Sequence, residues 1–298
     1  MKKQLIKWAS VAALATLMPV SLLTVGEFGV GQIQAAAEVN FDQGSMSDED
    51  YVRSVLKQFN ELDGYKSEMI DGLSSDTTTM IYDKASGGTK VTIELAASEF
   101  SDAMTVVQYI YDDGSMAADE LVYLEATAKM MEAIDPEFVT KIETLREQMG
   151  DALVLTPPTE GAETSAANEV FLTEDVAFTE IVKDGDKIKA TIDVEAYLAE
   201  NAEMLGFYPE GTKYAMVYEI DPATASVTST LTIDIDEEAI AEESGDEIGI
   251  SIASFLADTE VKVMMTATDE KVPSLTDLKT VTREEFTQLK ADAGLEGY

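Results

Sequence analysis

Two short segments of the chain have residue spacings that occur in functional sites. Ser54-Val55-Leu56-Lys57 matches the Ser-x-x-Lys pattern in which serine acts as a nucleophile, but the companion Ser-Asp-Asn and Lys-Thr-Gly patterns are missing. Residues 83–94 have the acid–glycine–acid spacing of an EF-hand calcium loop, but Ala85 and Gly87 stand where oxygen ligands are needed. We therefore expect a helix around Ser54 and a plain hairpin over residues 83–94.

Carboxyl groups are the most numerous reactive groups, and they gather at Asp112-Asp113, at Asp184 with Asp186, and within residues 234–238 and 242–247. Their oxygens suit weak calcium sites, and two facing carboxyls can cleave a glycosidic bond as acid and base. In a chain with 58 acidic residues, however, neighbouring acids are expected by chance. We interpret the clusters as solvated turns and strand faces, with weak calcium binding left open.

Two residue types that often do chemistry are missing, because the chain has no histidine and no cysteine. This excludes imidazole and thiolate as base, nucleophile or metal ligand. The sequence also contains no glycine-rich phosphate loop, nucleophile elbow or zinc motif. We expect no catalytic residue, no metal ligand set and no cofactor, and a hydrolase that uses paired carboxylates is the least favoured class.

The N-terminal residues have the pattern of a cleavable signal peptide over residues 1–37. Three lysines come first, followed by an uncharged apolar stretch and a small-residue cleavage site at residues 35–37. An uncleaved membrane anchor is the alternative, because the apolar stretch is close to the length that spans a bilayer. Pro19 interrupts that stretch, so we expect cleavage and a secreted protein, in the extracellular or cell-wall zone, with no membrane span and no lipobox cysteine.

Removal of residues 1–37 takes away three lysines and one glutamate, which leaves 17 basic and 57 acidic residues and a net charge of −40. Such a charge repels phosphate-rich partners, so neither nucleic acid nor anionic lipid headgroups are expected. Because 45% of the residues are hydrophobic and patterned, we expect a folded chain. Residues 38–46 are predicted to be a flexible arm and residues 47–298 one α+β domain, with two similar halves joined by a linker at 156–168 as a variant.

Helical spacing of apolar residues alternates with strand-like spacing along the chain. Ser47 begins a capping box for a helix at 47–62, and Asp135, followed by Pro136, is the predicted N-cap of a helix that ends at Gly150. Further helices are predicted at 125–134, 195–205 and 282–293. Strands are predicted at 77–82, 90–95, 104–111, 117–124, 176–182, 187–194, 214–220, 226–235, 248–255 and 260–266.

Most of these strands alternate apolar and polar residues, which is typical of antiparallel sheets with one buried face. The predicted fold class is α+β, with a curved antiparallel β-sheet, a half-barrel-like meander, packed on several helices. The predicted mature chain keeps 12 methionines, and such side chains line adaptable apolar surfaces as well as ordinary cores. If they line a cavity, the candidate ligand-binding residues lie on the middle helices: Met130, Met131, Phe138, Ile142 and Leu145.

Two segments of the predicted meander, together with the opening helix at 47–62, carry a resemblance to a known superfamily. They are Val107-Gln-Tyr-Ile-Tyr-Asp-Asp-Gly114 and Tyr218-Glu-Ile-Asp-Pro-Ala-Thr-Ala-Ser-Val227, the second similar to an Ile-Asp-Pro-x-Thr hairpin of secreted Gram-positive relatives. The order of elements over about residues 47–289 resembles the lipoprotein-carrier superfamily, the half-barrel fold of the LolA and LppX/LprG type. The resemblance implies binding of acyl chains or lipoproteins under a helical lid, while the missing lipobox cysteine departs from the lipidated members.

Together these observations predict a secreted, non-enzymatic binding protein that carries or sequesters an apolar or amphipathic, lipid-like ligand. The alternative is an acidic cell-envelope interaction protein with a solid core, which binds calcium or basic wall components. An apolar cavity would favour the carrier, whereas a densely filled interior would favour the alternative.

Overall fold

The computed structural model describes residues 39–71, 76–97, 103–131, 135–158, 176–194, 213–234 and 259–296. The chain forms two compact units, each assembled from separate stretches. The first takes its residues from 1–74 and 169–267, and the second from 75–168 and 268–298. The predicted signal peptide, the helix at 195–205, the strand at 248–255 and most of the linker at 156–168 lie outside the described residues.

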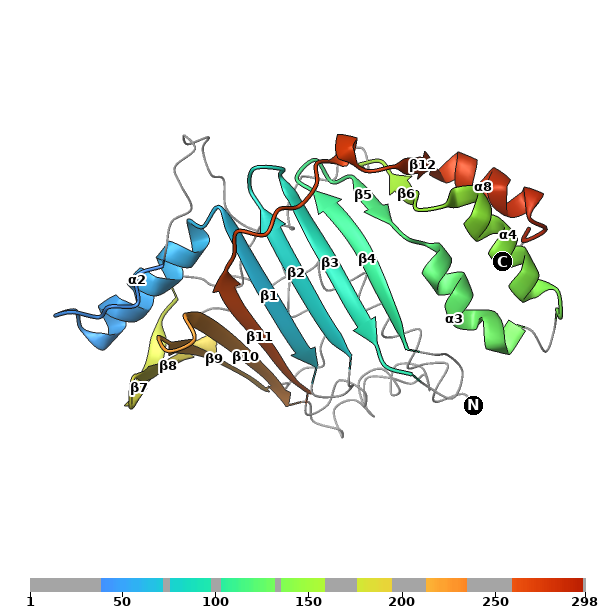
Figure 1. The fold of residues 1–298 in the computed structure, drawn as a ribbon. Coiled ribbons are helices and arrows are strands. Elements are labelled where there is room, and N and C mark those ends of the chain that lie inside the picture. Colours follow the sequence, from blue (N-terminus) through green and yellow to red (C-terminus); the bar gives the residue numbers. More distant parts are fainter. Residues whose placement is uncertain are drawn as a thin grey trace. The chain divides into compact units, whose positions relative to one another are not determined.

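In the first unit, six strands pair antiparallel in the order β1-β11-β10-β9-β8-β7 (Figure 1). They are β1 (Gly64–Asp71), β7 (Phe178–Asp184), β8 (Lys187–Ile192), β9 (Lys213–Asp221), β10 (Ser226–Asp234) and β11 (Thr259–Ala267). The strands from β7 to β11 were predicted to within a few residues, and short turns at Gly185 and at Pro222 join two of their pairs, β7–β8 and β9–β10.

Within the described residues of the first unit, helix α2 (Asp48–Asn60) contacts β7 and β8. It begins as predicted, because the Ser47 hydroxyl accepts a hydrogen bond from the Asp50 amide. Its apolar stripe is buried, and the tyrosine in that stripe, Tyr51, donates a hydrogen bond to the carbonyl of Phe41. Residues 39–46 are thereby attached to this helix.

The second unit contains six strands in the order β12-β6-β5-β4-β3-β2. All neighbours pair antiparallel except β12 and β6, which are parallel. The strands are β2 (Thr77–Asp83), β3 (Gly88–Leu95), β4 (Met104–Tyr111), β5 (Met116–Ala118), β6 (Leu153–Thr156) and β12 (Thr280–Thr282). Residues 83–94 form the plain β2–β3 hairpin that was expected, and Gly87 adopts a positive φ of 60° in its turn.

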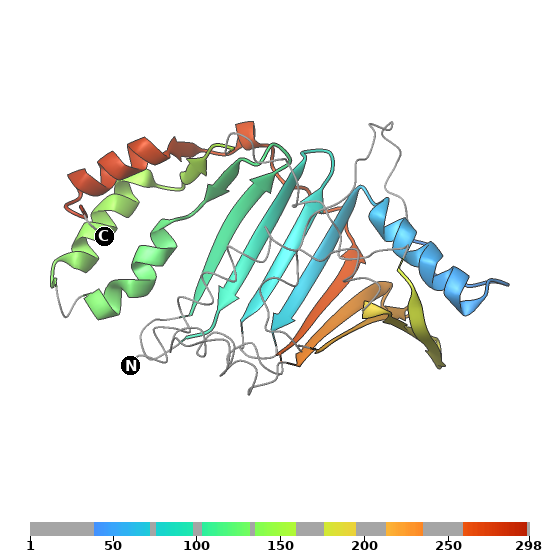
Figure 2. The ribbon, with the colours of Figure 1, turned by 180° about the vertical axis from the view of Figure 1, so that it is seen from behind.

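Three α-helices of the second unit, α3 (Leu121–Met131), α4 (Phe138–Met149) and α8 (Arg283–Asp292), follow or precede the short strands. The apolar sides of α4 and α8 meet in a filled core. Its buried members are Leu121, Phe138, Ile142, Leu145, Met149, Val154, Phe286 and Leu295. Seen from the front and from behind, α3 and α4 lie side by side, and α8 lies next to α4 (Figures 1 and 2).

Two predictions for the middle of the chain were wrong. The strand predicted at 117–124 ends at Ala118, and α3 begins at Leu121, because an Asp119 carboxylate oxygen accepts the Leu121 amide hydrogen. Before α4, Asp135 is not the N-cap. Residues 135–137 form a turn in which the Asp135 side chain accepts the Glu137 amide hydrogen, and Glu137 is the N-cap.

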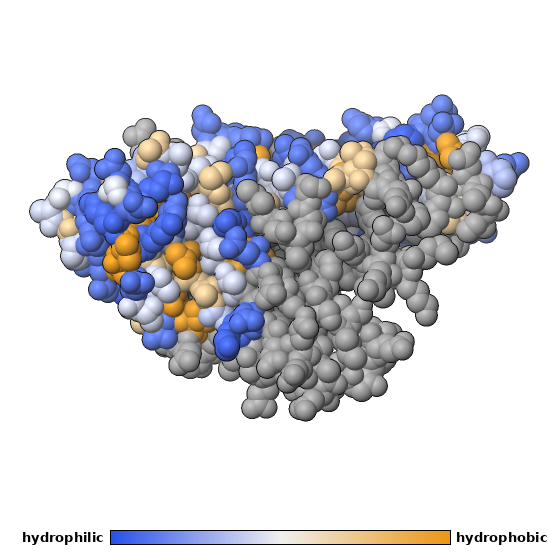
Figure 3. Space-filling model, turned by 90° about the horizontal axis from the view of Figure 1, so that it is seen from below, coloured by the Kyte–Doolittle hydropathy of each residue, from blue (hydrophilic) through white to orange (hydrophobic). Residues whose placement is uncertain are grey.

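The predicted α+β class, with a curved and mainly antiparallel sheet and several helices, is confirmed. Among the coloured residues of Figure 3, hydrophilic side chains predominate, and hydrophobic residues form small patches between them. This distribution agrees with the excess of acidic over basic residues.

The N-terminus of α8 gives a first testable prediction. Thr282 and Glu285 form a capping box, and the bonds from the Thr282 amide and hydroxyl hold the pKa of the Glu285 carboxyl below its ordinary value. A lowered folded-state pKa stabilises the fold above the unfolded pKa of about 4.3, and the contribution disappears as the pH falls through the folded value. We expect Glu285→Ala to lower the melting temperature more at pH 7 than at pH 3. Glu284→Ala, in the same turn without these bonds, is the control, and equal losses at both pH values would contradict the assignment.

Candidate functional site

The strongest candidate site is a groove between α3 and α4, which we call the α3–α4 groove. It has a volume of about 470 Å³, within the roughly 300–1,000 Å³ of small-molecule sites. Helix α3 contributes Glu125 and Ala128, and α4 contributes Val139, Ile142, Glu143, Arg146 and Glu147. Because Ile142 is only 4% exposed and belongs to the buried core cluster, the groove lies on the surface over the core of this unit.

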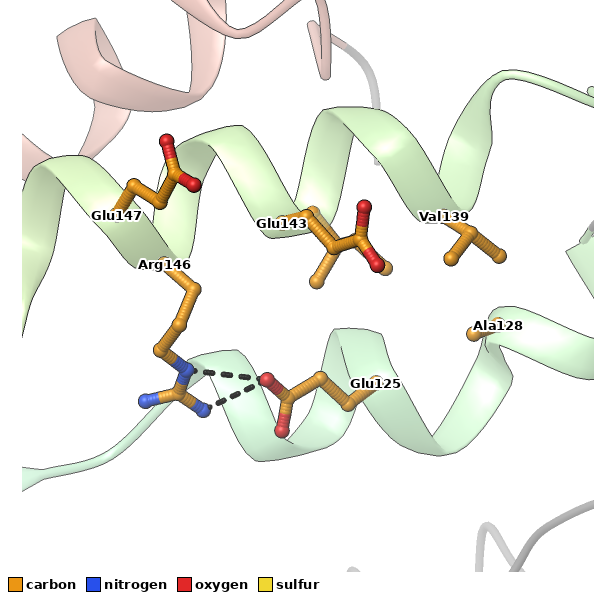
Figure 4. A pocket seen from close by; sticks show the side chains of 7 residues that line it. Glu125, Ala128, Val139, Glu143, Arg146 and Glu147 are labelled. Atoms are coloured by element: carbon orange, nitrogen blue, oxygen red, sulfur yellow. Dashed lines mark hydrogen bonds and ion pairs between the residues drawn. The ribbon is translucent and has the colours of Figure 1, made fainter.

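One end of the groove is closed by Arg146, which joins the two helices. Its Nε and Nη2 atoms lie 3.0 and 2.9 Å from Glu125 Oε1 (Figure 4). Its Nη1 atom lies 2.8 Å from Asp119 Oδ2. Burial lowers the pKa of the Arg146 guanidinium, but the hydrogen bonds and charges of Asp119 and Glu125 outweigh burial and raise it above its ordinary value. Arg146 is therefore permanently charged and held by two carboxylates.

The other end of the groove is apolar. Val139 on α4 and Ala128 on α3 face each other across the gap, away from the Arg146–Glu125 pair (Figure 4). Glu143 and Glu147 lie on the α4 side of the groove, both exposed, and no described residue forms an ion pair or hydrogen bond with either carboxylate. The groove thus has an apolar end, a charged end and two exposed acids along one wall.

Comparisons with known proteins add little to this geometry. The sequence matches no family model and no curated protein. Among solved structures, an uncharacterised conserved protein from Thermus thermophilus is similar over 80% of this chain and all of that chain, at 10% identity and a TM-score of 0.33. A likeness this low carries no argument about fold or function.

The five residues predicted to bind a ligand are divided between the core and its border. Phe138 and Leu145 are fully buried, and Ile142 is buried with one side toward the groove. Met131 is partly buried against the same core. Met130 lies in α3, but the structure describes only its backbone and not its side chain. Ile142 is therefore the predicted ligand residue that lines the α3–α4 groove, and ligand binding by the others stays a prediction.

The residues that form the apolar and the charged ends of the groove were not selected from the sequence. Ala128 and Val139 are small beside the methionines and phenylalanine that were selected, and none of the charged lining residues was among the predicted ligand residues. The sequence does place Glu143 and Glu147 four residues apart on one helix, with Arg146 three residues after Glu143. That spacing alone does not single out a site, because neighbouring acids are common in a chain with 58 acidic residues.

The other sequence candidates have structural roles where they are described. Ser54 lies in α2, where its hydroxyl accepts a hydrogen bond from the side-chain amide of Gln58. In the acid pair Asp112-Asp113, Asp113 accepts the Ser115 amide hydrogen and closes the β4–β5 turn. Among the described residues, no three acidic side chains come close enough together to hold a metal ion.

The same part of the chain bears on the membrane question. No helix within the described residues is long and apolar enough to cross a bilayer. The predicted signal peptide, which contains the most apolar stretch of the sequence, lies outside those residues.

Proposed function

We propose that the chain is a secreted, non-enzymatic binding protein that holds an amphipathic molecule in the α3–α4 groove. The observation that carries this proposal is the polarity of the groove along its length, from Ala128 and Val139 at one end to the Arg146–Glu125 pair at the other. An elongated ligand with an apolar tail and a polar head fits such a surface in one orientation. Secretion is inferred from the N-terminal pattern of the sequence.

The proposal differs from an interior lipid carrier in where the ligand lies. Phe138 and Leu145 have no exposed surface to offer a ligand, because they pack against the side chains of α8 and β6. The lipoprotein-carrier resemblance supports ligand binding near the middle helices. The buried core supports a binding site on the surface of these helices and not beneath them. A short acyl or alkyl chain is therefore a better fit than a long one enclosed by protein.

The alternative of an acidic interaction protein is favoured by a different observation, the filled core together with the net charge of the predicted mature chain. Binding of this kind depends on the summed charge and weakens as salt screens it. It does not depend on the apolar end of the groove. The two proposals can therefore be separated by a substitution that blocks the groove without changing any charge.

The test is titration of the mature chain with 1-octanol, a neutral amphiphile, followed by calorimetry and by amide chemical shifts. We expect saturable binding with shifts concentrated in α3 and α4. Val139→Trp fills the apolar end and should weaken binding at least tenfold. Thr140→Trp, one residue away on the exposed side of α4, is the matched control. No saturable uptake, or equal losses in both variants, would overturn the groove as the site.

A further inference from the structure

Strand β7 forms a free edge of the first unit. It is the last strand in the order β1-β11-β10-β9-β8-β7, and both ribbon views show β8 on one side of it and no other described strand on the opposite side (Figures 1 and 2). All of its residues are exposed or half-buried. At the opposite end of the strand order, β12 has only three residues and leads directly into α8. β7 is therefore the edge that is long enough to pair with a further strand.

The hairpin geometry shows which backbone groups of β7 point outward. Gly185, with a φ of 66°, opens a two-residue loop, so Asp184 and Lys187 flank the loop as a hydrogen-bonded pair. Bonded and non-bonded pairs alternate along an antiparallel ladder, which turns the amide and carbonyl groups of Ile181 and Lys183 away from β8. Within the described ranges these outward groups form no hydrogen bond. An extended chain lying along β7 would bond to both residues.

The usual protections of an edge strand are weak in β7. Natural edge strands are blocked by proline, by a bulge or by a charged side chain, most often lysine. β7 has no proline, and its bulge lies at its start, between Phe178 and Glu180. Its lysine, Lys183, has its ammonium group 2.9 Å from the side-chain oxygen of Gln43, in the segment before α2, so it is engaged within the unit. The stretch from Glu180 to Asp184 is therefore open to pairing.

The side chains along this edge specify the chemistry of a partner. Glu180, Val182 and Asp184 alternate along β7, so they share the face opposite to Ile181 and Lys183. All three are exposed, and Val182, at 45%, is the most exposed large apolar side chain among the described residues. Cross-strand neighbours lie about 5 Å apart, so a strand paired with β7 places every second side chain beside these three. A basic, an apolar and a second basic side chain fit these positions.

From this edge we propose that the first unit binds an extended basic segment of a partner protein, which adds a strand to β7. The segment has two basic residues four positions apart with an apolar residue midway between them, and its backbone bonds to Ile181 and Lys183. A second copy of the chain is a poorer occupant, because each copy has 58 acidic and 20 basic residues and the copies repel each other. The inference is separate from the α3–α4 groove, which belongs to the second unit.

The experiment titrates the mature chain with two fluorescent seven-residue peptides of the same composition and charge. One has lysine at positions two and six, valine at position four and threonine elsewhere, so that these three side chains share one face. In the other, the second lysine is moved to position five, on the opposite face. We expect the first peptide to bind about tenfold more tightly and to shift amide signals in β7 and β8. Equal affinities would overturn the inference in favour of diffuse attraction.

Two variants of Lys183 test the backbone contact. Lys183→Pro removes the outward amide hydrogen and no bond to β8, whereas Lys183→Ala keeps that hydrogen. Both lose the same positive charge and the contact with Gln43, so charge cannot distinguish them. We expect the first peptide to bind about tenfold more weakly to Lys183→Pro than to Lys183→Ala. Equal binding by the two variants would contradict strand addition.

A charge reversal keeps the test decisive if proline disturbs the hairpin. Glu180→Lys with Asp184→Lys should reverse the preference between the first peptide and its counterpart with glutamate at positions two and six. An unchanged preference would overturn the assignment of the face. Sedimentation of the chain alone tests the second copy as occupant. A dimer that persists in Lys183→Ala and dissociates in Lys183→Pro would show that β7 pairs with itself, and it would replace the basic segment as the occupant.

Discussion

Phe138→Ala is expected to destabilise the second unit by about 3–5 kcal/mol, the range for removing a buried aromatic ring. The ring has no exposed surface and packs in the core formed by α4, α8 and β6. Domains have only about 5–15 kcal/mol of stability, so a large part of the second unit's stability is at stake. Urea unfolding followed by far-ultraviolet circular dichroism measures the change, with Leu145→Ala expected to cost about 2–5 kcal/mol.

The matched control for both variants is Thr140→Ala, on the exposed side of the same helix, with an expected change within about 0.5 kcal/mol. The result also decides between two positions for a ligand. If Phe138→Ala lowers the free energy of unfolding by less than about 1 kcal/mol, the core is not tightly packed around the ring. That result would favour an acyl-chain binding site in the interior. A large loss leaves the groove on the surface of α3 and α4 as the place for a ligand.

Much of the architecture follows from local signals in the sequence. The strand at Met104–Tyr111 was predicted to the residue, because it is rich in β-branched and aromatic residues and Asp112-Asp113-Gly114 ends it. Helix α2 was predicted through its Ser47 cap and its single apolar stripe. In both cases one pattern fits one structure, and no distant contact is needed to decide between alternatives.

The errors occur where a short apolar run fits two structures. Leu121, Val122 and Leu124 are compatible with a strand or with the first turn of a helix, and the Asp119 side chain, which accepts the Leu121 amide hydrogen, forms a turn directly before α3. Strand β6 was missed for a similar reason, since Leu153–Thr156 is short and its parallel neighbour β12 lies far later in the chain, at Thr280–Thr282. Non-local partners of this kind leave little trace in the local pattern.

The site was harder to predict than the fold, because its lining depends on which helix residues are buried in the core and which remain at the surface. Size and apolarity selected Phe138 and Leu145, and these are the properties that place a side chain in the interior. The groove is lined instead by Ala128, Val139 and charged residues left at the border of the core. Arg146 finds its partners 21 and 27 residues earlier in the chain, so its role as the link between helices appears only once α3 and α4 are placed together.

A buried carboxylate outside the groove supports the second large effect. Asp83, at the end of β2, has a side chain only 3% exposed. One carboxylate oxygen accepts the Val272 amide hydrogen at 3.3 Å, and the other accepts the Ala85 amide and the Lys271 ammonium, each at 3.2 Å. These bonds attach the segment before η2 (Leu275–Asp277) to the β2–β3 hairpin.

A neighbouring tyrosine strengthens the same attachment. The Tyr111 hydroxyl donates to the Pro273 carbonyl at 2.9 Å. Burial, followed by the charges of Tyr109 and Asp277, raises the pKa of Tyr111 to about 12, so the hydroxyl keeps its proton and remains a donor throughout the neutral range. The segment is thus held at two successive residues, Val272 and Pro273, before the chain continues to β12 and α8.

Asp83→Ala is expected to cost about 2–4 kcal/mol, because it leaves the buried Val272 amide without its acceptor and removes hydrogen bonds to a charged group. Lys271→Ala should cost less than about 1 kcal/mol, since its side chain is 69% exposed and the ion pair is screened by water. Hydrogen exchange of peptides that cover residues 268–275 should accelerate in Asp83→Ala and change little in Lys271→Ala. If both variants lose the same stability, the ion pair and not the amide bond holds the segment, and its attachment becomes sensitive to salt.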